Sequence, residues 1–189
     1  HLLQPQPSVH ISRVTPDRFL KAASRVIRKG YGYPSVFNSD AVVMEQIRVG
    51  KSVEDARQGG TSGCIETGAF GKEAYILTGY LNVPKIFEIT LNNGRDPLTG
   101  AQVGLETGEA DDFESFDELY RAFEKQLGYI VDLKIRVNNY IERMYAKYSP
   151  APFLSVVIND CIDKGRDYYD GGPRYNTNYI QCCGIGTVT

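Results

Sequence analysis

The stretch VHISRVTPDRFLKAASRVI at residues 9–27 decides the fold class. Residues 9–14 alternate apolar and polar side chains, which is the pattern of a short β-strand. Thr15 can cap a helix and Pro16 is tolerated at the first helical position, so a helix is expected to begin there. Its apolar side chains keep to one face, and Gly30 is placed to end it. A strand followed at once by a helix is the unit of an α/β fold.

The length and composition are those of an ordinary globular domain. The chain has 189 residues, of which 42% are hydrophobic and 23% charged, and its formal net charge is −2. This composition excludes a disordered or collagen-like chain, and a nucleic-acid binder would need a positive footprint. No apolar run approaches the roughly 20 residues that span a bilayer. We therefore expect neither a nucleic-acid nor a membrane partner.

The ends of the chain and the number of cysteines indicate where in the cell the protein is found and whether the chain is part of a longer protein. Residues 1–7 have neither the basic nor the apolar segment of a signal peptide. Four cysteines are too few for a disulfide scaffold, so a reducing, cytoplasmic setting is expected. The chain starts at His1 without a methionine and stops at Thr189 directly after an apolar stretch. It is therefore expected to be an internal piece of a longer protein.

The rest of the chain alternates helical patterns with polar loops. Residues 31–38 are predicted to form a loop. Ser115 opens a capping box ahead of a long apolar stripe, which predicts a helix from residue 116 to about 148. The other predicted elements are helices over 39–48, 69–81, 84–92 and 153–164 and a strand over 179–188.

The segment with the most unusual backbone demands contains Cys64 and Glu66. Four of the ten residues 59–68 are glycines, a composition that cannot form a stable helix interior. In an extended segment, residues i and i+2 project to the same side. The Cys64 thiol and the Glu66 carboxyl are therefore expected to face one cavity.

Three chemistries combine a cysteine with a carboxylate. A thiolate nucleophile needs a histidine base or a cationic neighbour, whereas the sequence holds only His1 and His10, and a carboxylate opposes thiolate formation. A metal site needs more ligands than one cysteine and one glutamate supply, and no metal is expected. A thiyl radical abstracts a hydrogen atom without forming a thiolate, provided that the thiol is held against a substrate C–H with water excluded.

The residues around Cys64 resemble the cysteine loop of the glycyl radical enzymes, the pyruvate formate-lyase-like family. The similar stretch is SGCIETGAFGKEAYILTGYLNVPKI at residues 62–86. The segments LNNG at 91–94, GGPRYNT at 171–177 and GIGT at 184–187 extend the resemblance over essentially the whole chain. The resemblance is greatest to a branch of dehydratases that remove water from small hydroxylated substrates such as hydroxyproline.

The resemblance implies a fold and a reaction. Residues 1–189 would be an internal segment of a ten-stranded α/β barrel, the segment that carries the cysteine loop. Cys64 matches the residue whose thiyl radical takes hydrogen from the carbon next to the one that bears the departing hydroxyl. Glu66 matches the base that assists proton transfer as water leaves, after which Cys64 returns the hydrogen. Tyr80 matches a tyrosine near the substrate.

The resemblance also implies a cofactor and partners. The family's glycyl radical lies in a C-terminal loop of the type Arg-Val-x-Gly-Tyr, which this sequence lacks, so the 189 residues alone are expected to be inactive. A radical S-adenosylmethionine activase with an iron–sulfur cluster would install the radical, and oxygen would destroy it, which implies an anaerobic cytoplasm. The other implied partners are a small-molecule substrate, the remainder of the parent polypeptide and a second copy in a homodimer.

Alternatives to this interpretation stay open. Cys182 and Cys183 are adjacent, as are two cysteines of pyruvate formate-lyase, but they precede GIGT in a predicted strand, and strand residues are the favoured interpretation. A decarboxylase acting on an arylacetate, or a lyase for C–S or C–N bonds, would use the same Cys64 loop. The remaining alternative is a catalytically silent segment that folds or binds within an assembly.

Other residues with reactive side chains have simpler interpretations. Cys161 lies at an apolar-face position of a predicted helix and is expected in the core. His10 lies in the first predicted strand and is expected to have a structural role. Residues 174–176 are expected either to line a polar pocket or to form a loop held by hydrogen bonds.

Overall fold

The computed structural model describes residues 6–188, and these group into two compact units. The first unit contains the chain up to residue 76 together with residues 150–177. The second contains residues 77–149 and the chain from residue 178 onward. Within the described residues, no helix is both long enough and apolar enough to cross a membrane.

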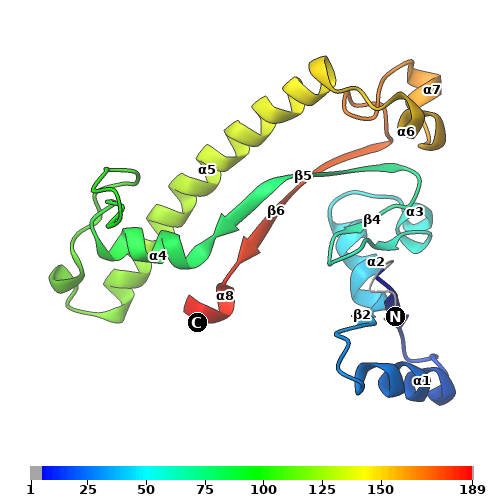
Figure 1. Ribbon diagram of the computed structural model, residues 1–189, viewed down its shortest axis with the longest axis horizontal. Helices are drawn as coiled ribbons and strands as arrows, with labels where there is room; N and C mark the ends of the chain where they lie inside the picture. The colour runs from blue at the N-terminus through cyan, green and yellow to red at the C-terminus, as the bar shows by residue number, and fades with distance from the viewer. Residues whose placement is uncertain (1–5, 189) are drawn as a thin grey trace. The chain divides into compact units, whose positions relative to one another are not determined.

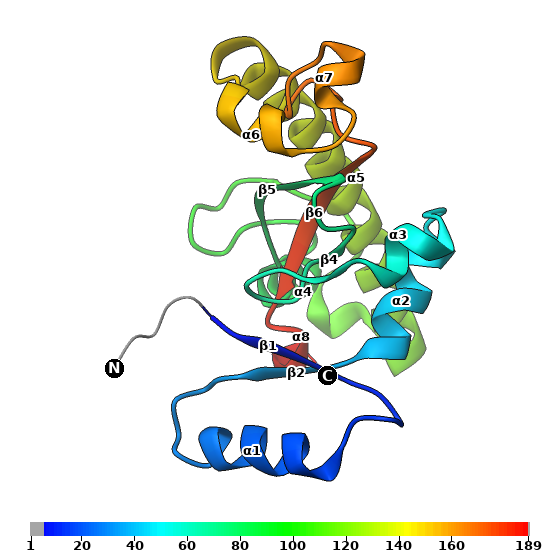
Figure 2. The ribbon, with the colours of Figure 1, turned by 90° about the vertical axis from the view of Figure 1, so that its right-hand side faces the viewer.

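The first unit begins with the strand and helix that the sequence predicts, followed by a second strand. Strand β1 (Ser8–Ile11) is followed by helix α1 (Asp17–Ile27) and strand β2 (Ser35–Asn38). The two strands are parallel, with Ser8 opposite Ser35 and Ile11 opposite Asn38, and α1 forms the crossover between them (Figure 2). The α/β character is confirmed, whereas the prediction of a loop over 31–38 is wrong in its second half, which pairs with β1.

Two capped helices and a short hairpin complete the N-terminal part. Helix α2 (Ser39–Arg48) is capped by the side chain of Asn38, and helix α3 (Val53–Arg57) by that of Ser52. Strands β3 (Gly60–Thr61) and β4 (Thr67–Gly68) then form an antiparallel hairpin. Each strand has only two residues, which is too short to show periodicity in the sequence.

The prediction of a helix over residues 69–81 is wrong. Gly71 has a φ of 70°, a left-handed conformation that a helix cannot contain, and strand β5 (Glu73–Asn82) follows it. Its sequence EAYILTGYLN is rich in aromatic and β-branched residues that favour strands. Strand β5 pairs with strand β6 (Tyr175–Cys183), and this long-range pairing overrides the local helical pattern.

The second unit is built on two helices that pack together (Figure 1). Helix α4 (Val83–Leu91) is capped by Asn82, and helix α5 (Phe116–Tyr148) by Ser115, as the capping box predicts. Phe87 and Phe123 meet edge to face between them, with ring centroids 5.7 Å apart. A 3₁₀ turn (η1, Ala110–Asp112) lies in the loop that joins the two helices.

The C-terminal part corrects two further predictions. The helix predicted over 153–164 is two short helices, α6 (Pro152–Val157) and α7 (Cys161–Lys164), because Asp160 adopts a φ of 75° between them. Cys161 is 2% exposed, which confirms its place in the core. The strand predicted over 179–188 starts earlier, as β6, and Gly184 at φ 77° turns the chain into helix α8 (Ile185–Val188).

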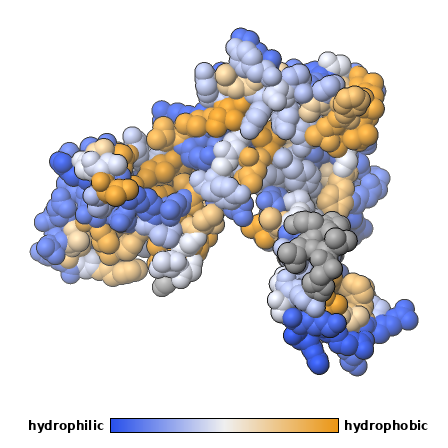
Figure 3. Space-filling view, in the orientation of Figure 1, coloured by the Kyte–Doolittle hydropathy of each residue, from blue (hydrophilic) through white to orange (hydrophobic). Residues whose placement is uncertain are grey.

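The molecular surface carries apolar side chains as well as polar ones. Figure 3 shows orange side chains over helix α6, where Phe153 is 91% exposed and Val157 is 67% exposed. Patches of this kind typically mark contacts with another protein segment. The described residues contain three two-stranded sheets, formed by β1 with β2, β3 with β4, and β5 with β6.

Candidate functional site

Cys64 lies at the tip of the hairpin formed by β3 and β4. We call residues 59–69 the Cys64 hairpin; its foot is residues 59–61 and 68–69. The backbone N–H of Ser62 donates to the carbonyl of Glu66 at 2.8 Å and closes the loop beyond the strands. Cys64 is a free, exposed cysteine. The thiol is therefore presented on a tight turn rather than on a strand or helix.

The Glu66 carboxylate is folded back onto its own loop. Its Oε2 accepts a hydrogen bond from Ser62 Oγ at 2.6 Å and one from the Ile65 N–H at 3.3 Å. Partial burial raises the pKa of Glu66, but the hydrogen bonds from Ser62 and from backbone N–H groups outweigh it, and the net pKa lies below its ordinary value. Glu66 is thus an anion at neutral pH, the form required of a base.

The relation between Cys64 and Glu66 differs from the expected one. Residues 63–65 form bends, so the extended-strand rule that placed both side chains on one side does not apply there. The two residues are still carried by one five-residue loop between β3 and β4. That they face a common cavity stays a prediction.

The first strand of the foot is fixed by His10. The ring Nε2 of His10 lies 2.9 Å from Thr61 Oγ1, and the Thr61 N–H also approaches it at 3.4 Å. A Cβ atom on Gly60 would lie 2.8 Å from the ring of Phe70, so glycine is required for this approach. His10 has the structural role expected of it.

The second strand of the foot is fixed by Glu73. The Oε2 atom of Glu73 accepts the N–H of Ala69 at 2.7 Å and forms an ion pair with Lys51 Nζ. Its other oxygen accepts a hydrogen bond from Thr177 Oγ1 at 2.5 Å. The Glu73 side chain is 0% exposed and that of Lys51 is 5% exposed. A buried ion pair of this kind is stable only when further hydrogen bonds satisfy it, as they do here.

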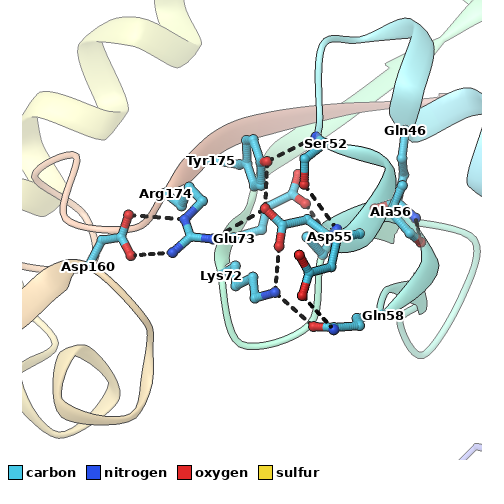
Figure 4. Close-up of polar contacts among 12 residues, drawn as sticks. Gln46, Ser52, Asp55, Ala56, Gln58, Lys72, Glu73, Asp160, Arg174 and Tyr175 are labelled. Carbon is cyan, nitrogen blue, oxygen red and sulfur yellow. Dashed lines mark hydrogen bonds and ion pairs between the residues drawn. The ribbon is translucent and has the colours of Figure 1, made fainter.

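A second ion-pair network lies next to the first (Figure 4). Asp55 accepts hydrogen bonds from Lys72 Nζ, from Tyr175 Oη at 2.7 Å and from Arg174 at 3.3 Å. The bonds from Lys72 and Tyr175 hold the pKa of Asp55 well below its ordinary value. Arg174 in turn pairs with both carboxylate oxygens of Asp160. Residues 174–176 are therefore held by ion pairs and hydrogen bonds, but Tyr175 and Asn176 begin strand β6, so the expectation of a loop is wrong for these two residues.

Tyr80 lies on the part of β5 that belongs to the second unit. Its side chain is 62% exposed. The neighbouring Gly79 has a φ of 143°, and a Cβ atom there would lie 2.7 Å from Lys134 Nζ. The role of Tyr80 near a substrate stays a prediction.

The residues predicted from the sequence to belong to this region do not include Lys51, Asp55 or Glu73. Lys51 and Glu73 are separated by 22 positions and meet only because the chain folds back through the hairpin. One available signal was the charged residue Glu73 inside a segment otherwise typical of a buried strand, since buried charges are rare unless paired. Among residues 6–188, no group of three or more His, Cys, Asp or Glu side chains is arranged to hold a metal ion.

Comparison with known proteins gives consistent matches over the whole chain. The sequence model of the family described as "Pyruvate formate lyase-like" matches residues 1–189. The chain is 56% identical over 188 residues to trans-4-hydroxy-L-proline dehydratase of Clostridioides difficile, covering 100% of this chain and 24% of that protein. It is 30% identical over 192 residues to indoleacetate decarboxylase of Tractidigestivibacter scatoligenes, covering 98% of this chain and 21% of that protein.

Solved structures of related proteins resemble the fold closely. Hydroxyproline dehydratase of Clostridioides difficile, with trans-4-hydroxy-L-proline bound, superposes with a TM-score of 0.94 over 99% of this chain and 24% of that chain. The B12-independent glycerol dehydratase of Clostridium butyricum, with glycerol bound, gives a TM-score of 0.87 at 35% identity over 95% of this chain and 23% of that one. The chain thus spans about a quarter of the length of the relatives that it matches.

Proposed function

The chain belongs to the pyruvate formate lyase-like family, and on that premise we propose that it is the cysteine-loop segment of a glycyl radical dehydratase. The proposed reaction is a carbon–oxygen lyase reaction that removes water from a small hydroxylated substrate such as hydroxyproline. The observation that carries the proposal is Cys64 with Glu66 on one hairpin, in a chain 56% identical to a hydroxyproline dehydratase.

The proposed roles follow from the state of the two side chains. The glycyl radical, which lies outside this chain, supplies the one-electron oxidation of the thiol. Cys64 is a free thiol at the end of a turn, so it presents the hydrogen atom that such an oxidation removes. Its thiyl form takes a hydrogen atom from the substrate carbon next to the one that bears the hydroxyl, and the same sulfur returns a hydrogen atom to the product radical.

Glu66 supports the departure of the hydroxyl. The C–O bond breaks heterolytically, so the leaving oxygen needs a proton to depart as water, and the substrate radical must lose one. A carboxylate held as an anion can accept the proton from the substrate and pass it on. The hydrogen bonds from Ser62 and the loop backbone favour that anion, which suits a base.

The proposal extends to the parts of the protein outside this chain. We propose that the strands described here belong to the ten-stranded barrel of the family and that the barrel shields Cys64 from water. The proposed partners are the remainder of the polypeptide with its glycyl radical, a radical S-adenosylmethionine activase and a second copy in a homodimer. The proposed location is an anaerobic cytoplasm. The exposed Cys64 and the apolar α6 surface are compatible with cover by further protein.

The test uses the full-length protein, activated without oxygen by its radical S-adenosylmethionine activase. Release of water from trans-4-hydroxy-L-proline, lost in Cys64→Ser, is the expected result. Release of CO2 from an arylacetate would support the decarboxylase alternative instead, which the 30% identity to indoleacetate decarboxylase raises. A protein that carries the glycyl radical yet converts neither substrate class would contradict the proposal and leave the C–S or C–N lyase and the silent assembly role as the alternatives.

A further inference from the structure

We propose that the buried Glu73–Lys51 pair is a positioning device for Cys64, with Glu73 holding the hairpin foot and Lys51 holding Glu73. The inference rests on the proposed function, because a cysteine needs positioning only if it reacts. Neither residue is expected to touch the substrate. Both act through the backbone of the hairpin, at the end opposite to Cys64.

The contact that transmits the effect is a single hydrogen bond to the backbone. Glu73 Oε2 accepts the N–H of Ala69, the residue directly after β4. The same oxygen lies against Gly68, where a Cβ atom would come within 2.7 Å of it and within 2.2 Å of Tyr75 Oη. The backbone at the end of β4 is thus in direct contact with the carboxylate.

Both sides of the hairpin foot contact one cluster of buried polar side chains, which consists of Gln46, Lys51 and Glu73. Lys51 Nζ donates to Gln46 Oε1 at 3.4 Å as well as pairing with Glu73. A Cβ atom on Gly59, directly before β3, would lie 2.9 Å from Gln46 Oε1. Gln46 is itself 1% exposed and donates to the carbonyl of Ala56 at 3.3 Å. Gln46, Lys51 and Glu73 therefore form one buried clamp, which contacts Gly59 before β3 and Gly68 in β4.

The charge pair gives this clamp its rigidity. Removing one partner of a buried pair leaves an uncompensated charge in the protein interior, which must move toward water or find another partner. Glu73 has no such freedom while Lys51 and Thr177 hold its two oxygens. Hydrogen-atom transfer requires the sulfur close to the reacting C–H bond, and a displacement of about 1 Å can lower a rate by ~100-fold.

The Asp55–Lys72 pair provides a matched control. It is also an ion pair between a well-buried carboxylate and a lysine, with side chains 6% and 14% exposed. Asp55 belongs to α3 and its bonds run to Lys72, Tyr175 and Arg174, none of which lies on the Cys64 hairpin. Asp55→Asn therefore disturbs the same unit without releasing the hairpin foot.

The experiment compares Glu73→Gln and Asp55→Asn in the full-length enzyme after anaerobic activation. Two quantities are measured: kcat per glycyl radical, counted by electron paramagnetic resonance, and the deuterium isotope effect on kcat with substrate labelled at the carbon that loses hydrogen. For Glu73→Gln we expect kcat per radical to fall ~100-fold with a small change in KM, and the isotope effect to rise as hydrogen transfer becomes rate-limiting. Asp55→Asn should keep the wild-type value of both.

The two proposals fail in different ways. A wild-type enzyme without radical-dependent turnover contradicts the proposed function. An active wild-type enzyme whose Glu73→Gln variant keeps its kcat per radical and its isotope effect contradicts the positioning role alone. If Glu73→Gln does not fold, the double variant Lys51→Met with Glu73→Gln, which leaves no unpaired charge, is judged by the same two readouts. Should neither variant fold while Asp55→Asn does, the pair is a folding requirement and the positioning role is rejected.

Discussion

The two ends of the Cys64 hairpin differ in exposure, in charge and in what holds them. At the tip, Cys64 is exposed, and the Glu66 carboxylate accepts hydrogen bonds from Ser62 and Ile65 of its own five-residue loop. At the foot, the Glu73 side chain is fully buried and joins the hairpin to Lys51 and Thr177. The comparison teaches that the exposed tip is held only by bonds of its own loop, whereas the foot is held by buried charged groups from outside the hairpin.

The largest expected effect is at the tip. Cys64→Ser removes the only group in the loop that can give up and return a hydrogen atom, so turnover by the activated full-length enzyme should be lost. The glycyl radical signal should persist, because the radical lies outside this chain. Product analysis beside electron paramagnetic resonance checks both statements. Cys183→Ser, another exposed cysteine, is the matched control and should keep its activity.

Glu66→Gln should have the next largest effect. The amide keeps the shape and a hydrogen-bond acceptor for Ser62 but cannot accept a proton, so kcat should fall by roughly 100- to 10,000-fold. The glycyl radical content should stay at its wild-type value. Equal activity of Glu66→Gln and wild type in a steady-state assay would show that the proton is moved by another group.

At the foot, a loss of stability is expected in addition to the loss of rate proposed for Glu73→Gln. Lys51→Met leaves the Glu73 carboxylate buried and unpaired, at a cost of about 3–5 kcal/mol. The full-length protein should therefore lose its activity at a clearly lower temperature. The control is Lys85→Met, because the Lys85 side chain is 35% exposed and forms ion pairs with Glu88 and Asp96 that solvent reaches, and such pairs contribute little to stability. The measurement is the temperature at which half of the activity is lost on heating. Equal values of this temperature for Lys51→Met and Lys85→Met would contradict the distinction between the buried foot and the surface.

The smallest expected effect is a change in pH dependence at the tip. Ser62→Ala removes a hydrogen bond that favours the Glu66 anion, so the pKa of Glu66 should rise. The base is active when deprotonated, and its activity is lost as the pH falls through that pKa. The acidic limb of kcat/KM should therefore move to higher pH, by about one unit or less. If the acidic side of the kcat/KM profile does not move in Ser62→Ala, the pKa that it reports belongs to a residue other than Glu66.

The same comparison shows what could be predicted from the sequence. The loop that carries Cys64 and Glu66 is predictable because its glycines are a local signal in the sequence. The helix cap Ser115 and the strand–helix pattern of residues 9–27 are local signals of the same kind. The foot was missed because Lys51 and Glu73 are brought together by the fold, and no local pattern encodes that contact. The prediction of a helix in place of β5 is wrong for the same reason. Strand β5 pairs with β6, which lies about 100 residues further along the chain, as the hydrogen bond from Thr177 to Glu73 shows.

The central claim is that Cys64 moves a hydrogen atom from the substrate and back. Its most direct test gives the activated full-length enzyme a hydroxyproline deuterated at the carbon next to the one that bears the hydroxyl. Our account predicts a primary isotope effect on product formation and deuterium carried into the product by the cysteine. Product formed at an unchanged rate, with all of that deuterium released to water, would contradict it, because elimination would then proceed by proton removal alone.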